Sequence, residues 1–232
     1  MTSQDTIYLD YAAATPVADH VLAAMMPYLT SNFYNPSSPY APAVQVRRDY
    51  EAAKQQLGQS IGAKGDEIII TAGATESINL AFHAASGHAV TAAIEHPAVL
   101  ECAKLRDHTF IAVNEKGRVR VEDVAAAIQP STQLVSIAFA NNELGTIQPI
   151  RKIAQAIESI RAARLENGDR TPLYFHCDAS QGFGQIDINV ARLGVDMLTL
   201  NSGKMYGPKQ VGLLWRKRNI EIQPLVTGGG QE

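Results

Sequence analysis

The sequence lacks the features that mark secreted, membrane-spanning and nucleic-acid-binding proteins. Its only two cysteines, Cys102 and Cys177, are too few for a disulfide framework or a zinc cluster, so no metal site is expected and a cytoplasmic location fits. No apolar run approaches the roughly 20 residues that span a bilayer, and the N-terminus has neither the basic nor the apolar region of a signal peptide. The net charge of −3 offers no basic field to a nucleic-acid backbone.

What the sequence does contain is an ordinary globular mixture, 46% hydrophobic and 19% charged over 232 residues, enough for one large domain. Short apolar runs alternate with longer helical patterns. Strands are expected at 67–71, 88–94, 109–113, 118–121, 133–139, 173–177, 195–200 and 211–216, and helices at 19–30, 42–61, 75–85, 97–104, 122–128 and 150–164. The alternation predicts an α/β protein of three layers, a mostly parallel sheet with helices on both faces.

In such a sheet, ligands bind beyond the carboxyl ends of the strands, so the loops that follow strands are the places to look for chemistry. The loop in TAGATES (71–77) has small residues followed by a helix, and with Thr75 it is suited to bind a phosphate. The alternative is a simple helix cap. His96 ends another strand and is suited to stack on a flat cofactor or move protons. A structural, hydrogen-bonded histidine is the competing interpretation.

Two further loops carry amide and carboxylate side chains. Asn142, in FANNELGTIQPI, offers both a donor and an acceptor to a ligand, although an Asx turn closed by Gly145 explains it equally. Asp178 stands where an apolar strand ends, and a carboxylate there needs a cation such as the protonated ring nitrogen of pyridoxal 5′-phosphate (PLP). Gln181 follows within reach of a neighbouring ring oxygen. The simpler interpretation of Asp178 is a helix N-cap.

A lysine follows the strand expected at 195–200. Lys204 comes after the small residues Ser202 and Gly203, and a lysine held beside a buried site can form a Schiff base. A solvated surface lysine is the commoner fate. Each simple interpretation is plausible alone, but the five loops occur in the order phosphate loop, histidine, asparagine, aspartate and lysine, which favours a PLP site.

That order resembles the class V aminotransferase superfamily of fold-type I PLP enzymes, and in detail its cysteine desulfurase branch. The segments that carry the resemblance, in family order, are YLDYAAATPV (8–17), NPSS (35–38), GATES (73–77), EHPAVL (95–100), NNELGTIQPI (141–150), DASQ (178–181) and GKMYGPKQVG (203–212).

The resemblance implies a role for each matching residue. Lys204 would bind PLP as the Schiff-base lysine and move protons as a catalytic residue, and His96 would stack on the ring and assist. The other implied roles are Asp178 on the pyridine nitrogen, Gln181 on the phenolic oxygen, Ala74 and Thr75 on the phosphate, Asn142 beside ring and substrate, and Ala12 and Ala13 at the substrate entrance.

The sequence departs from the family pattern in two ways. Where the family usually shows S-x-H before the lysine, this chain has Asn201, Ser202 and Gly203, which are kept as cofactor-binding candidates, with weaker phosphate binding expected. Family members also continue for well over a hundred residues, which carry a persulfide-forming cysteine and a substrate-binding arginine. The C-terminal small domain is therefore expected to be absent, and residues 1–232 to be inactive alone.

The resulting expectation is an N-terminal segment, 1–15, and an incomplete PLP-binding large domain, 16–232. The resemblance implies a cysteine desulfurase that converts L-cysteine to L-alanine, with a homodimer and a sulfur-acceptor protein as partners, for iron–sulfur cluster assembly or tRNA thiolation. Two alternatives stay open. One is another class V enzyme, an aminotransferase or a selenocysteine lyase. The other is a non-catalytic remnant that serves as a binding or dimerisation module.

Overall fold

The computed structural model describes residues 7–229. Residues 1–6 of the expected N-terminal segment, and the last three residues of the chain, lie outside the described part. The helices are α1 (Asp19–Thr30), α2 (Ala41–Ser60), α3 (Ala74–His83), α4 (Pro97–Lys104), α5 (Val121–Ala127), α6 (Ile150–Glu166) and α7 (Val190–Leu193). The strands are β1 (Ile68–Thr71), β2 (His88–Ala92), β3 (His108–Ile111), β4 (Thr132–Ala138), β5 (Tyr174–Asp178), β6 (Met197–Asn201) and β7 (Gly212–Arg216).

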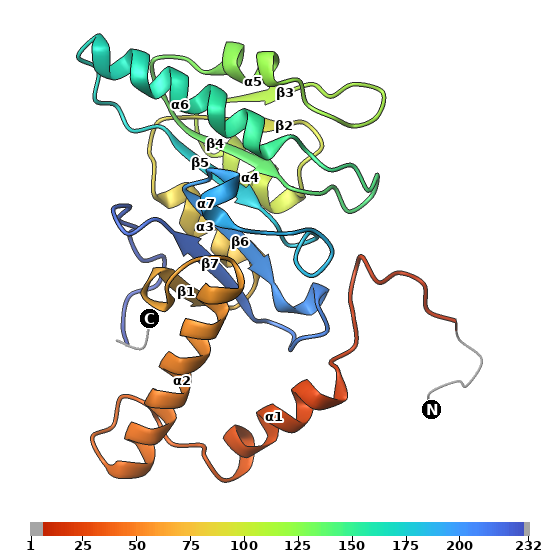
Figure 1. Ribbon diagram of the computed structural model, residues 1–232, viewed down its shortest axis with the longest axis vertical. Helices are drawn as coiled ribbons and strands as arrows, with labels where there is room; N and C mark the ends of the chain where they lie inside the picture. The colour runs from red at the N-terminus through yellow and green to blue at the C-terminus, as the bar shows by residue number, and fades with distance from the viewer. Residues whose placement is uncertain (1–6, 230–232) are drawn as a thin grey trace.

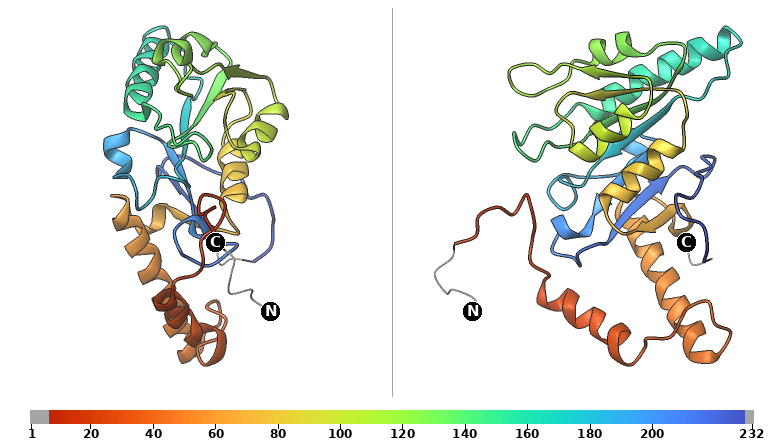
Figure 2. Two further views of the ribbon diagram at one scale, coloured as in Figure 1. Left: turned by 90° about the vertical axis from the view of Figure 1, so that its right-hand side faces the viewer. Right: turned by 180° about the vertical axis from the view of Figure 1, so that it is seen from behind.

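All seven strands form one sheet in the order β1-β7-β6-β5-β4-β2-β3. Strands β2 to β6 all run parallel to one another, and β7 is antiparallel to both β1 and β6. Helices α3 and α4 lie on one face and α5, α6 and α7 on the other, which the edge-on view of Figure 2 shows. The expected α/β class, with a mostly parallel sheet between helical layers, is confirmed.

The core lies on both faces of the sheet because successive residues of a strand point in opposite directions. In β4, Leu134 joins the apolar cluster under α3 and α4, and Val135 joins the larger cluster under α5 and α6. Both side chains are fully buried. This two-sided burial explains why the central strands are almost continuously apolar in sequence.

One expected element is wrong. Residues 118–121 form no strand, because residues 114–118 make a tight turn in which the Asn114 side chain accepts hydrogen bonds from the backbone of Lys116 and Arg118. The backbone N–H of Val119 then donates to the Gln148 side chain at 3.0 Å, and α5 begins two residues later. The apolar residues there are buried by a loop and a helix start, and periodicity alone does not separate these from a short strand.

Helix α1 and the first half of α2 extend away from the sheet (Figure 1). None of the residues of α1 is buried. Exposed large apolar side chains gather on these helices and the segment between them, namely Leu22, Met26, Tyr28, Leu29, Phe33 and Tyr40. Within residues 7–229, nothing covers this surface.

Candidate active site

The carboxyl ends of β2, β4, β5 and β6 meet the N-terminus of α3 at one edge of the sheet, where a cavity of about 610 Å³ opens. All five of the loops singled out in the sequence contribute to its wall. All but two of the expected site residues line it: Ala12, Ala13, Ala74, Thr75, His96, Asn142, Asp178, Gln181, Asn201 and Lys204.

Asp178 occupies the last position of β5 and is 8% exposed. Its Oδ1 atom accepts two hydrogen bonds from Ser180, from the backbone N–H at 3.0 Å and from the hydroxyl at 2.6 Å. These bonds fix the carboxyl group, and among the described residues no donor is bonded to Oδ2. A buried carboxylate with one oxygen still available is well placed to bind a cationic ligand.

Lys204 lies in the short 3₁₀ turn after β6, half-buried. Its Nζ atom donates to the backbone oxygens of Ala12 at 2.8 Å and Ala13 at 2.7 Å. Gln181 also donates to the Ala12 oxygen, at 2.9 Å. The N-terminal segment therefore lies directly against the lysine, and Ala12 and Ala13 contribute backbone rather than side-chain chemistry.

The N-terminus of α3 forms another wall of the cavity. Gly73, the residue before the helix, has a φ of 134°, a conformation that favours glycine. Strand β7 approaches this turn so closely that a Cβ atom at Gly212 would lie 2.6 Å from the carbonyl carbon of Gly73 and 3.0 Å from the nitrogen of Ala74. Within residues 7–229 the Thr75 hydroxyl has no hydrogen-bond partner, so it and the helix N-terminus are available to an anion.

His96 is the N-cap of α4, and its Nδ1 atom accepts a hydrogen bond from the backbone N–H of Ala98 at 3.1 Å. A neutral imidazole that accepts at Nδ1 carries its proton on Nε2. The capping bond therefore fixes the tautomer in which Nε2 is a donor. His96 both caps a helix and lines the cavity, so the structural and functional interpretations of this histidine hold together.

The residues before Lys204 have different surroundings. The Asn201 side-chain oxygen accepts from the backbone N–H of Gly203 at 3.1 Å, which leaves the Asn201 amide group to line the cavity. Ser202 donates to the backbone oxygens of Pro208 and Val211 and lines a separate apolar cavity of about 70 Å³. Neither Ser202 nor Gly203 lines the larger cavity, and their expected contacts to a cofactor stay predictions.

Sequence reasoning missed the buried carboxyl group of Glu95. This side chain is 6% exposed, and its two oxygens accept the backbone N–H of Ala138 at 2.9 and 3.0 Å, at the end of β4. Burial, and secondarily the charge of Asp178, raises the pKa of Glu95 to about 8. The only available signal was a carboxylate directly before a histidine at a strand end, a place where charge is normally solvated.

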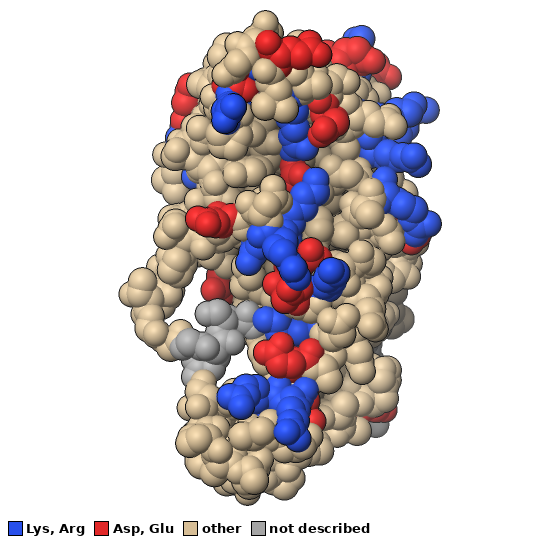
Figure 3. Space-filling view, turned by 60° about the vertical axis from the view of Figure 1, so that its left-hand side comes forward, with Lys and Arg blue, Asp and Glu red and all other residues tan. Residues whose placement is uncertain are grey.

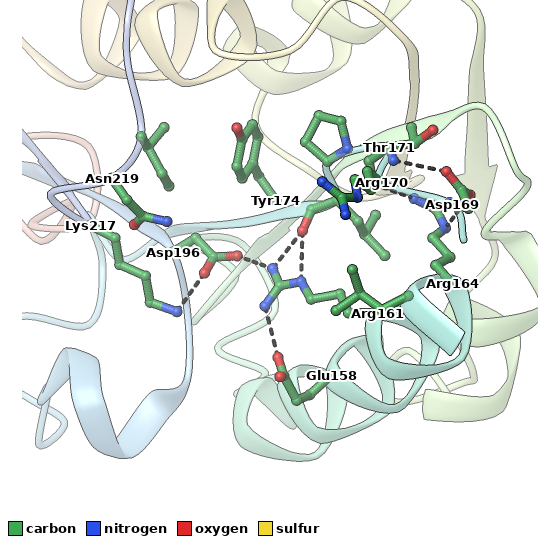
Figure 4. Close-up of a pocket in the computed structure, with 14 residues that line it drawn as sticks. Glu158, Arg161, Arg164, Asp169, Arg170, Thr171, Tyr174, Asp196, Lys217 and Asn219 are labelled. Atoms are coloured by element: carbon green, nitrogen blue, oxygen red, sulfur yellow. Dashed lines mark hydrogen bonds and ion pairs between the residues drawn. The ribbon is translucent and has the colours of Figure 1, made fainter. Parts of the chain in front are cut away.

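A second cavity of about 610 Å³ lies near the opposite edge of the sheet, where β5 and β6 begin (Figure 4). Most of its charged side chains bind one another: Asp196 pairs with Arg161 and with Lys217, and Arg161 also donates to the backbone oxygen of Leu173. Arg164 donates to the oxygen of Thr132. These bonds within the protein indicate a structural role for Asp196 and its partners.

The molecular surface carries no extended field of one sign on the face that Figure 3 shows, where basic and acidic side chains interleave. Within residues 7–229, no group of three or more His, Cys, Asp or Glu side chains is arranged to hold a metal ion. In the same range, no helix is both long enough and apolar enough to cross a membrane.

A sequence profile described as aminotransferase class-V matches residues 7–232, almost the whole chain. The chain belongs to this family. It is 40% identical to the proteins named cysteine desulfurase IscS 1 of Archaeoglobus fulgidus and cysteine desulfurase IscS of Dictyoglomus turgidum, with 97% of this chain covered in each case. The chain spans only 59% and 58% of the length of those class V relatives.

Solved structures of class V proteins share the fold. A structure named "SspA in complex with cysteine" superposes with a TM-score of 0.88 at 37% identity, and the match covers 97% of this chain and 66% of the other. A structure named "NIFS-LIKE PROTEIN" gives a TM-score of 0.89 at 31% identity, with 97% and 63% covered. Class V aminotransferases and cysteine desulfurases depend on PLP.

The cavity fits this cofactor. The cavity is lined by Lys204, by the buried carboxylate of Asp178, by the Thr75 hydroxyl and by the N-terminus of α3, which is suited to a phosphate. Among residues 7–229, Asp178 Oδ2 and the Thr75 hydroxyl have no hydrogen-bond partner, so both are available to a ligand. The lysine suits the aldehyde of PLP, the carboxylate suits its ring nitrogen, and the hydroxyl and helix N-terminus suit its phosphate.

Proposed function

We propose that the chain is the cofactor-binding part of a cysteine desulfurase, an enzyme that converts L-cysteine to L-alanine and passes the sulfur to an enzyme thiol as a persulfide. The observation that carries the proposal is that Lys204 and Asp178 line one cavity with the N-terminus of α3. The identity of 40% to proteins named cysteine desulfurase supports the choice of reaction. The product sulfur would serve iron–sulfur cluster assembly or tRNA thiolation.

When bound, PLP supplies an electron sink that makes the α-carbon of an amino acid acidic. In the proposed role, Asp178 Oδ2 would accept a hydrogen bond from the protonated ring nitrogen, and its negative charge would keep the ring cationic, while Ser180 holds Oδ1 in place. Lys204 Nζ then takes the proton from the substrate α-carbon. His96 Nε2, which carries a proton in the tautomer fixed by Ala98, is a donor over the cavity.

The remaining residues bind and orient. The backbone of Ala74 and the hydroxyl of Thr75 are proposed to hold the phosphate at the α3 N-terminus, with the Asn201 amide as a further donor. Because the Gly203 N–H already donates to Asn201, this set has fewer donors than the S-x-H pattern would supply. Gln181 is proposed for the phenolic oxygen and Asn142 for the substrate carboxylate.

The proposal extends to the substrate, the partners and the location of the protein. The substrate would be L-cysteine, and the similarity to the SspA structure, which is named as a complex with cysteine, supports this choice. A homodimer, a sulfur-acceptor protein and a cytoplasmic location are proposed with it, together with the division into segment 1–15 and domain 16–232. Residues 1–232 alone are proposed to be inactive in desulfuration.

The test uses the 232-residue chain, PLP and borohydride, which locks a lysine-bound cofactor in place for mass spectrometry. We expect one modified lysine, Lys204, and loss of the modification in Lys204→Ala. The exposed Lys152→Ala is the matched control and should bind PLP as the unchanged chain does. Modification elsewhere, or none, would count against the site and favour a non-catalytic remnant.

A second measurement separates binding from chemistry. Asp178→Asn should still bind PLP, but an uncharged amide cannot keep the ring nitrogen protonated, so exchange of the α-hydrogen of L-cysteine for deuterium from the solvent should fall by about two orders of magnitude or more. Equal exchange rates in both proteins would show that Asp178 does not have this role. Transfer of the amino group to a keto acid would instead indicate an aminotransferase.

A further inference from the structure

Thr15 is buried in a part of the chain that is otherwise open to solvent. From residue 7 to residue 42 it is the only buried residue, at 4% exposure. Its surroundings are the turn that carries Lys204, more than 180 positions away in the sequence. A polar side chain buried in this way is stabilised only if its hydrogen bonds are made.

The hydroxyl of Thr15 binds on both sides of Lys204. It donates to the backbone oxygen of Gly203 at 3.1 Å and accepts the backbone N–H of Tyr206 at 2.8 Å. The Thr15 backbone N–H also donates to the Gly203 oxygen, at 3.1 Å. One side chain thus fixes the residue before the lysine and the residue two positions after it.

The turn needs such a contact. Tyr206 has a φ of 61°, in the left-handed region that residues other than glycine rarely adopt. Strained backbone persists where surrounding contacts hold it, and the bond to Thr15 is made by the N–H of this residue. The same N-terminal segment supplies the backbone oxygens of Ala12 and Ala13 that accept from Lys204 Nζ.

We propose that Thr15 is a positioning residue whose hydroxyl clamps the 203–206 turn to the N-terminal segment and so sets the place of the Lys204 amino group. The inference rests on the proposed function and deepens it, since it names a residue outside the cavity wall on which the reactive lysine depends. Thr15 itself does not line the cavity.

Three variants test the clamp. Thr15→Val keeps the shape and removes both hydroxyl bonds, and Thr15→Ser keeps the hydroxyl. Thr91→Val is the matched control, because Thr91 is fully buried and its hydroxyl donates to the backbone oxygen of Ser136 at 2.7 Å, within the sheet. The melting temperature of each variant reports the general loss of stability.

The first readout needs no cofactor. Lys204 is acetylated with a limiting amount of acetic anhydride and compared by mass spectrometry with the exposed Lys152 in the same sample. We expect Lys204 in Thr15→Val to react about fivefold to tenfold faster than in the unchanged chain, the effect of losing about one hydrogen bond's net stabilisation. Thr15→Ser and Thr91→Val should stay within about twofold.

The outcomes are distinct. If Thr15→Val and Thr91→Val change Lys204 equally, or if Thr15→Ser behaves like Thr15→Val, the positioning role is overturned. In the second readout, PLP and borohydride should modify Lys204 about tenfold less in Thr15→Val, with rescue by Thr15→Ser. Failure of the unchanged chain to take up PLP at Lys204 would count against the proposed function only, because the acetylation rates still decide the role of Thr15.

Discussion

At the scale of single residues, Glu95 links the stability of the site to pH. Its raised pKa of about 8 means that the folded protein keeps a proton which the unfolded chain releases near pH 4.5. Stability from this group is complete below pH 4.5 and is lost as pH rises to about 8. Glu95→Gln should remove this loss, since an amide oxygen still accepts the Ala138 N–H and does not ionise.

The experiment is urea unfolding at several pH values. His176 contributes an opposite slope below pH 6.5, because burial lowers its pKa to about 3, so the informative window runs from pH 6.5 to about 8. In this window the free energy of unfolding should decrease with rising pH more steeply in the unchanged chain than in Glu95→Gln. The two slopes should differ by up to about 1.4 kcal/mol per pH unit. The exposed Glu101→Gln should keep the original slope, and parallel curves for all three proteins would refute the assignment.

The sequence predicted the residues that follow strands better than those whose partners lie far away in the chain. Lys204 and Asp178 stand out because a charge interrupts an apolar run at a strand end, a pattern that is visible locally. Glu95 and Thr15 were missed because their importance depends on hydrogen bonds with the backbone of Ala138 and Gly203, which are distant in the chain and which no local pattern reveals. Ser202 was predicted to bind the cofactor from its position before Lys204, but its hydroxyl donates to backbone oxygens away from the cavity, which local sequence does not reveal.

At the scale of elements, the close approach of β7 to the turn before α3 fixes the proposed phosphate site. Gly212→Ala would place a methyl carbon 2.6 Å from the Gly73 backbone, so the turn must move. We expect PLP affinity to fall by about tenfold or more, measured by equilibrium titration. Gly182→Ala is the control, since its Cβ would come no closer than 3.3 Å to the Phe139 ring. Equal affinities in the two variants would contradict the role of the contact.

The Asp196 side chain connects α6, β5 and the segment after β7 at the opposite edge of the sheet. Its side chain is 5% exposed, pairs with Arg161 of α6 and Lys217 after β7, and accepts the Phe175 N–H of β5 at 2.8 Å. Asp196→Asn leaves two cations without their partner and should lower the free energy of unfolding by about 1–3 kcal/mol. The exposed pair of Asp187 with Arg192 is the comparison, and Asp187→Asn should change it by less than about 0.5 kcal/mol.

Most elements of the fold could be predicted from the sequence because their signals are local. The helix at 150–164 has a clear amphipathic period, and the strands at 133–139 and 173–177 are apolar runs between polar turns; the structure places them within a few residues. The antiparallel insertion of β7 between β1 and β6 could not be predicted, since strand order depends on contacts between distant segments. The false strand at 118–121 arose because the buried Val119 and the partly buried Val121 show the same alternation in a loop as in a strand.

At the scale of the whole molecule, two observations bear on solubility: α1 and the segment after it expose apolar side chains, and the relatives are longer than this chain. A soluble protein rarely leaves a contiguous apolar surface uncovered, and Leu29 and Phe33 are 65% and 67% exposed. The class V relatives are longer, since this chain spans 58–59% of them. Purified residues 1–232 should therefore bind a dye specific for apolar surface, and Leu29→Glu with Phe33→Glu should reduce the binding and improve solubility without changing the PLP site.

The last prediction concerns sulfur itself, which needs an accessible thiolate to receive it. Cys177 is fully buried, and its pKa is raised by burial and then by the charges of Asp178 and Glu95. Cys102 is 6% exposed, and burial raises its pKa as well. Both thiols should therefore be protonated and unreactive in the folded chain.

With PLP and L-cysteine, residues 1–232 should form no protein persulfide, as measured by trapping with an alkylating reagent and mass spectrometry. The control is the same trapping reaction in denaturant, where both cysteines should be alkylated at the rate of free thiols. Cys102 is the cysteine to examine for a persulfide, because it lines a cavity of about 400 Å³ together with His96 and Thr75. A persulfide on Cys102, lost in Cys102→Ser, would show that the chain has its own sulfur acceptor and would contradict the proposal that residues 1–232 alone are inactive in desulfuration.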